Sequence, residues 1–103
     1  EALEEYVRCF ADPAAVHASC EDYRAGAGVD DRLDAADLGR RRIACPVLVL
    51  WGTEGIARRA EDPLASWRPW CDDPRGQGVP GGHFLPEESP AETLAALLDF
   101  LRD

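Results

Sequence analysis

Apolar residues recur at helical spacing in the first forty residues of the chain. In residues 1–10 they predict a helix with one buried face, formed by Leu3, Tyr6, Val7 and Phe10. Asp12 and Pro13 predict the start of a second helix, because an aspartate accepts backbone N–H bonds at an N-cap and proline suits the first helical position. That helix can end at Gly26 or Gly28. Residues 30–39 predict a third, shorter and very polar helix.

At residue 46 the sequence changes from apolar residues at helical spacing to a continuous apolar run. Residues 47–51 are an uninterrupted apolar run between Pro46 and Gly52, which is typical of a central parallel strand covered on both faces. Asp62 and Pro63 repeat the cap-plus-proline start and predict a helix of about two turns, limited by Pro69. Residues 75–80 predict a second strand more weakly, because two glycines dilute it.

The final helix has the strongest signals. Ser89 and Glu92 form an S-x-x-E capping box, with Pro90 at the first helical position. A stripe at helical spacing is predicted to pack against a sheet, and it consists of Leu94, Leu97, Leu98 and Leu101.

The order strand, helix, strand, helix in the second half predicts a parallel sheet with right-handed crossovers, and thus an α/β fold. Two parallel strands buried on both faces do not make a stable sheet alone, since their outer edges stay unpaired. The chain also begins in a helical pattern and contains no methionine. We therefore expect a fragment whose neighbouring strands lie outside this chain.

Composition excludes several classes of function. With 20 acidic and 11 basic residues the formal charge is −9, which opposes binding to nucleic acids and to anionic membranes. The basic run at residues 40–42 is typical of a solvated helix end. No apolar run is long enough to span a bilayer.

The four cysteines are widely spaced and have no histidine at metal-ligand spacing. We therefore expect small buried thiols in a reducing cytoplasm, and neither a metal nor another cofactor. The four are Cys9, Cys20, Cys45 and Cys71.

His83 is the candidate for chemistry. It directly follows the second predicted strand, where ligands bind in open parallel sheets, and the glycines before it allow a sharp turn. Histidine exchanges protons near neutral pH and suits a general base. The alternative is a capping or solvent-exposed histidine. His17, in the middle of a helix, is expected to be structural.

A base needs a nucleophile and an orienting acid. No nucleophile elbow of the form G-x-[S/D/C]-x-G occurs, and we reject Asp31 and the three serines, Ser19, Ser66 and Ser89. Glu54 is either the acid or part of a solvated turn, since Gly55 occupies the usual position of the acid.

Three stretches together resemble a known family. "CPVLVLWG" and "GGHFLPEESPAET" resemble the C-terminal end of an α/β hydrolase. With "HASCEDYRAGAG" the chain resembles the last part of haloacetate dehalogenases, the fluoroacetate dehalogenase group. The resemblance implies the C-terminal fragment of an α/β-hydrolase fold, with cap helices in residues 1–40 and the last two strands and helices of the core in residues 41–103.

The resemblance also implies a reaction. In that family an aspartate displaces halide from a short haloacid, and a histidine activates the water that hydrolyses the resulting ester. His83 matches this histidine, and Tyr23 matches a cap tyrosine that holds the halide. The nucleophile precedes the segment, so the chain alone is not expected to turn over. We expect a cytoplasmic hydrolase with a haloacid substrate, and a homodimer is left open for the intact protein.

Two alternatives remain. The first is an epoxide hydrolase or another, esterase-like α/β hydrolase, because the strand and histidine motifs also occur in epoxide hydrolases, where a cap tyrosine would protonate an epoxide oxygen. The chain is otherwise an inactive truncated product, or a piece that works only with a complementary chain.

Overall fold

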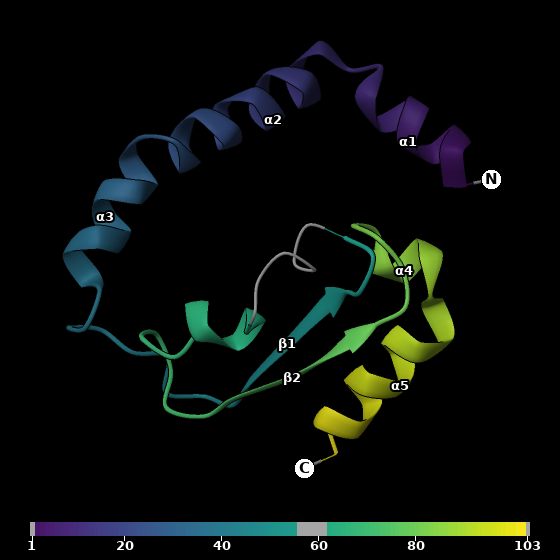
Figure 1. Cartoon of the computed structure of the whole chain (residues 1–103). Helices are drawn as coiled ribbons and strands as arrows, with labels where there is room; N and C mark the ends of the chain where they lie inside the picture. Colours follow the sequence, from purple (N-terminus) through teal and green to yellow (C-terminus); the bar gives the residue numbers. More distant parts are fainter. Residues whose placement is uncertain (1, 56–61, 103) are drawn as a thin grey trace. The chain divides into compact units, whose positions relative to one another are not determined.

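The computed structural model of the chain describes residues 2–55 and 62–102 (Figure 1). The chain divides into two compact units, Glu1–Arg40 and Arg41–Asp103, and each is described by itself. The first unit is helical, and the second contains the sheet.

The first unit confirms the three helices expected from the sequence. They are α1 (Ala2–Phe10), α2 (Pro13–Gly26) and α3 (Val29–Asp37). Asp12 caps α2 as predicted, because its carboxylate accepts the N–H of Ala14 at 2.9 Å. None of the described helices of the chain is long and apolar enough to cross a membrane.

The predicted burial of α1 does not occur within this unit. Its four apolar side chains are at least 51% exposed, and none of the three helices has a buried residue. A helix stripe is buried only where a second layer covers it. Three helices in succession do not provide that layer, so the period of the pattern predicted the helix correctly and its burial wrongly.

The second unit is built on a two-stranded parallel sheet, as predicted. β1 (Val47–Gly52) pairs with β2 (Pro74–Val79), with Val47 opposite Pro74 and Gly52 opposite Val79. A bridge between Ile43 and Cys71 extends the pairing upstream. Within the described residues β1 pairs with β2 alone, so its other edge has no strand beside it.

The two glycines that weaken the β2 signal are required by close neighbours on β1 and just after it. A Cβ at Gly76 would lie 2.2 Å from the carbonyl oxygen of Val49, and one at Gly78 would lie 2.7 Å from Thr53 Cγ2. The ring of Trp51, at 3.1 and 3.2 Å, would also be crowded by side chains at both positions. The sheet needs the residues that make its second strand hard to recognise.

The helix expected after Asp62 is shorter than predicted. Asp62 does cap it, accepting the N–H of Leu64 at 3.0 Å, but the element is a four-residue 3₁₀ helix, η2 (Pro63–Ser66). The guanidinium of Arg42 donates to the carbonyls of Arg68 and Pro69 at 3.3 and 3.1 Å. These bonds hold the residues that follow η2 in turns. They are tertiary contacts, so the local sequence pattern does not predict them.

The chain ends in two helices where one was expected, α4 (Leu85–Glu88) and α5 (Pro90–Phe100). The predicted capping box does not form, because the Ser89 hydroxyl donates instead to the carbonyl of Pro80. Thr93 is the buried residue of α5, and its hydroxyl donates to the carbonyl of Leu85 at 3.3 Å.

The leucine stripe of α5 is only partly covered, although α5 contacts β1. Its four leucines are between 41% and 74% exposed. Two strands about 4.8 Å apart are narrower than a helix with its side chains, about 10 Å across. The sheet of this chain therefore cannot cover the whole stripe.

The cysteine expectation is wrong for three of the four. Cys71 is buried at 2% exposure, and its thiol donates to the carbonyl of Trp67 at 3.3 Å. Cys9, Cys20 and Cys45 are exposed free thiols. The first two lie on helices that bury no residue, which is why they gain no shelter.

Val79, only 1% exposed at the end of β2, is the test of this small core. We expect Val79→Ala to lower the free energy of unfolding by about 2 kcal/mol, because it removes buried methyl groups and leaves a cavity. Leu101→Ala, at a side chain that is 74% exposed, is the control and should cost much less. Urea unfolding followed by tryptophan fluorescence measures both, and equal losses would contradict the assigned core.

Candidate functional site

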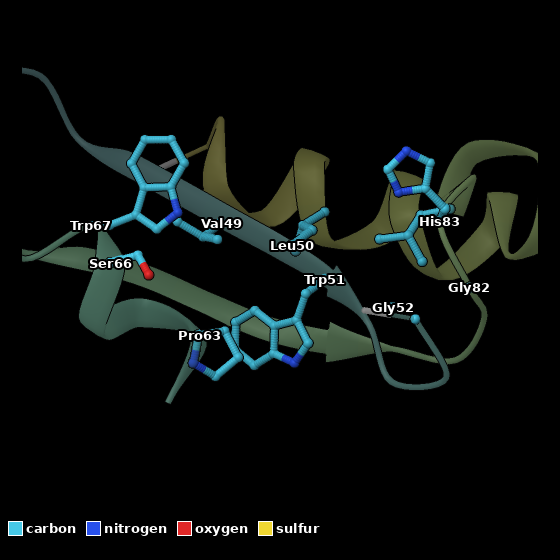
Figure 2. A pocket seen from close by; sticks show the side chains of 11 residues that line it. Val49, Leu50, Trp51, Gly52, Pro63, Ser66, Trp67, Gly82 and His83 are labelled. Atoms are coloured by element: carbon cyan, nitrogen blue, oxygen red, sulfur yellow. The ribbon is translucent and has the colours of Figure 1, made fainter. Parts of the chain in front are cut away.

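His83 is exposed on the turn that joins β2 to α4. Because β1 and β2 are parallel, both strands end at this edge of the sheet. Figure 2 shows the imidazole at one end of a pocket, beside Gly82. The structure therefore places His83 where the sequence predicted it, beyond the carboxyl ends of the strands.

The carboxylate of Glu88 binds the backbone on both sides of His83. One oxygen accepts the N–H of Gly82 at 2.5 Å, and the other accepts the N–H of Phe84 at 3.0 Å. These two bonds are the main reason that the pKa of Glu88 lies below its ordinary value, and the charge of His83 contributes least. Glu88 thus fixes the backbone of residues 80–84, which form the histidine turn between β2 and α4.

Sequence analysis missed Glu88. Its signal was an acid five residues after the histidine, directly before Ser89 and Pro90. Proline disfavours helical backbone in the residue before it, so Pro90 indicates that a short helix ends before Ser89. Glu88 is then the last residue of that helix, and its carboxylate can bind backbone N–H groups that precede the helix. We instead assigned Ser89 to the following helix.

The histidine turn also rests directly on the end of β1. The N–H of Glu54 donates to the carbonyl of Gly81 at 2.9 Å. A Cβ at Gly52 would lie 1.8 Å from the carbonyl oxygen of Gly82, so this contact requires glycine. Gly81 has φ +128°, a conformation that side chains rarely allow. Glycine is thus required at Gly52 by the close contact and at Gly81 by the backbone conformation of the turn.

A pocket of about 550 Å³ begins at His83. Its walls are mainly apolar and include Val49, Leu50, Trp51, Pro63 and Trp67. Consecutive residues of a strand point to opposite faces, so a pocket lined by residues 49–51 runs along the unpaired edge of β1.

Ser66 also lines this pocket but does not pair with the histidine. Figure 2 shows it beside Trp67, at the end away from His83. A serine nucleophile must lie within hydrogen-bond reach of its base. The position agrees with our rejection of Ser66 from the sequence.

Tyr23 lies on α2 in the first unit, whereas His83 belongs to the second. Its side chain is 80% exposed, and its carbonyl accepts the N–H of Ala27 at the end of the helix. A phenol this open on α2 is not a packing residue of its own unit.

Glu54 reaches the site through its backbone, while its side chain is exposed. His17 is exposed on α2. Among residues 2–55 and 62–102, no group of three or more His, Cys, Asp or Glu side chains could hold a metal ion.

The fold of the chain is that of part of an α/β hydrolase. A candidate α/β hydrolase from Nostoc sp. PCC 7120 superposes on it with a TM-score of 0.90 and 55% identity, over 97% of this chain and 34% of that protein. A candidate epoxide hydrolase from Pseudomonas aeruginosa superposes with a TM-score of 0.87 and 46% identity, over 98% and 34%. No family model matches the chain.

The particular resemblance is to fluoroacetate dehalogenase. The chain is 43% identical to that enzyme from Burkholderia sp. over all 103 residues, which are 34% of the relative. The resemblance inferred from the sequence is thereby confirmed. The chain spans about a third of the length of these relatives.

The lowered pKa of Glu88 predicts how the histidine turn responds to acid. Its ordinary value is 4.5, so the ionised carboxylate stabilises the turn fully above pH 4.5, and this contribution is lost as pH falls through the lowered pKa. In ¹H–¹⁵N NMR spectra the amides of Gly82 and Phe84 should shift together, with a midpoint below 4.5. A midpoint at or above 4.5 would show that the carboxylate does not bind them.

Proposed function

We propose that the protein containing this chain hydrolyses short haloacids, converting a haloacetate to glycolate and halide. The observation that carries this proposal is His83, displayed beyond two parallel strands on a turn that Glu88 and Gly52 fix. The 43% identity with fluoroacetate dehalogenase along the whole chain supports the choice of substrate.

The reaction proceeds in two steps. A carboxylate oxygen of an aspartate outside this chain attacks the α-carbon of the haloacid, a C–O bond forms, and the halide leaves with the electrons of the carbon–halogen bond. Water then attacks the carbonyl carbon of the resulting ester while His83 takes its proton. The bond between the carbonyl carbon and the glycolate oxygen breaks, His83 returns the proton to that oxygen, and the aspartate carboxylate is regenerated with loss of a proton to solvent.

Tyr23 binds the departing halide in this proposal. Its O–H can donate to fluoride as negative charge develops, which stabilises the transition state more than the substrate. Its exposure on α2 agrees with a side chain that serves a site instead of its own unit. Residues 1–40 are then the last helices of a cap, and residues 41–103 are the end of the hydrolase core.

The chain by itself is not expected to turn over. It contains no nucleophile elbow, and the unpaired edge of β1 and the exposed leucines of α5 are surfaces that a longer protein would cover. Activity therefore belongs to a protein that also supplies the aspartate.

An epoxide hydrolase is the second candidate, favoured by the 46% identity with the Pseudomonas structure. Tyr23 would then donate its proton to an epoxide oxygen, while His83 would keep its role. The full-length protein, assayed with fluoroacetate, chloroacetate and a panel of epoxides, distinguishes the two. Turnover of epoxides without halide release would replace the first proposal by the second.

His83→Ala in the full-length protein should lower turnover by about 10² to 10⁴-fold, because no base activates the water. The ester should accumulate, and mass spectrometry of the protein after incubation with substrate would detect the added mass. His17→Ala is the matched control, since this exposed histidine lies on α2. Parental turnover by His83→Ala would refute the role of His83.

Tyr23→Phe should slow halide release by about 10²-fold while leaving hydrolysis of the formed ester unchanged, because only the first step expels halide. The loss should be larger for fluoroacetate than for chloroacetate, since fluoride is the poorer leaving group. Tyr6→Phe on α1 makes the same chemical change as a control. Equal rates for Tyr23→Phe and the parent protein would contradict halide binding by Tyr23.

A further inference from the structure

Glu88 occupies the space beside the two glycines of the histidine turn. A Cβ at Gly81 would lie 3.3 Å from Glu88 Oε2, and one at Gly82 would lie 3.1 Å from the same atom. The carboxylate can approach the backbone closely because these residues have no side chains. The turn and the acid therefore fit each other.

The two bonds of Glu88 suit a carboxylate better than any neutral side chain. The N–H groups of Gly82 and Phe84 both point at it, one to each oxygen. A carboxylate offers two acceptor oxygens, whereas the amide of glutamine offers one oxygen and an NH₂ group that repels an N–H donor. Hydrogen bonds to a charged acceptor are also the stronger kind.

Glu88 does not have the position of an orienting acid of a catalytic triad. Such an acid bonds to the imidazole itself. Glu88 uses both oxygens on the backbone, one residue before and one residue after His83. It fixes where the residue lies.

We propose that Glu88 is a positioning residue for His83, holding the Gly82–Phe84 backbone so that the imidazole is presented at the end of the sheet. The inference rests on the proposed function, in which His83 activates water. Two further bonds support the clamp, since the Ser89 hydroxyl binds the carbonyl of Pro80 and the Glu54 N–H binds that of Gly81. Glu88 is the residue of this set that contacts the N–H groups on both sides of the histidine.

The test compares Glu88→Gln with Glu92→Gln, which makes the same change four residues later on α5. Single-turnover kinetics of the full-length protein separate ester formation from ester hydrolysis. Glu88→Gln should slow hydrolysis by about 10 to 100-fold, the cost of a displaced catalytic group, and leave ester formation at the parental rate. In NMR spectra of the full-length protein, the amides of Gly82 and Phe84 should change in Glu88→Gln and not in Glu92→Gln.

Parental ester hydrolysis in Glu88→Gln, or an equal loss in both steps, would overturn the inference. The first result shows that positioning does not matter, and the second shows a general structural defect. These failures differ from that of the proposed function. If the proposed function is wrong, the parent protein releases no halide from haloacids or His83→Ala turns over like the parent, whereas an error about Glu88 alone leaves the parent active, His83→Ala stalled and Glu88→Gln active.

Discussion

The parallel pairing of β1 with β2 is the constraint on which the second unit depends. It brings both carboxyl ends to one edge, so that the turn after β2 lies against the residues that follow β1. The contact between Gly52 and the carbonyl of Gly82 is a consequence of this pairing. Without this pairing, the end of β1 would not support the glycine-containing turn that carries His83.

A turn of this kind has a conflict to resolve. It needs glycine to pass close to Gly52 and to adopt the positive φ of Gly81, yet glycine is the residue with the most freedom to lose on folding. The side chains that fix the turn must therefore come from its neighbours. Glu88 and Ser89 supply these side chains, although the sequence pattern did not identify either residue as a partner of the turn.

The sequence predicted the features that depend on residues close in the chain. Asp12 and Asp62 cap their helices because the N–H groups they bind lie two residues on. The run at residues 47–51 was recognisable as a strand because it is short, partly β-branched and bounded by Pro46 and Gly52. The position of His83 followed from strand order alone.

The features that were missed depend on contacts that form only once the turns and the strands are in place. Ser89 leaves its helix for the carbonyl of Pro80, and Arg42 binds carbonyls more than twenty residues away. A polar side chain binds a partner that the tertiary structure brings near, whereas a local motif identifies only one possible partner. Glu88 belongs to the same class, since its function is visible only when the turn is in place.

The two residues proposed for the site differ in what fixes them. His83 is held by residues between 52 and 89, all within the second unit, so its geometry is a property of this chain. Tyr23 is exposed on a helix of the first unit, and nothing within that unit restricts its phenol to one use. In the proposed reaction the position of the water-activating histidine is thus set within this chain, whereas the choice between halide and epoxide would depend on the groups that a longer protein places opposite Tyr23.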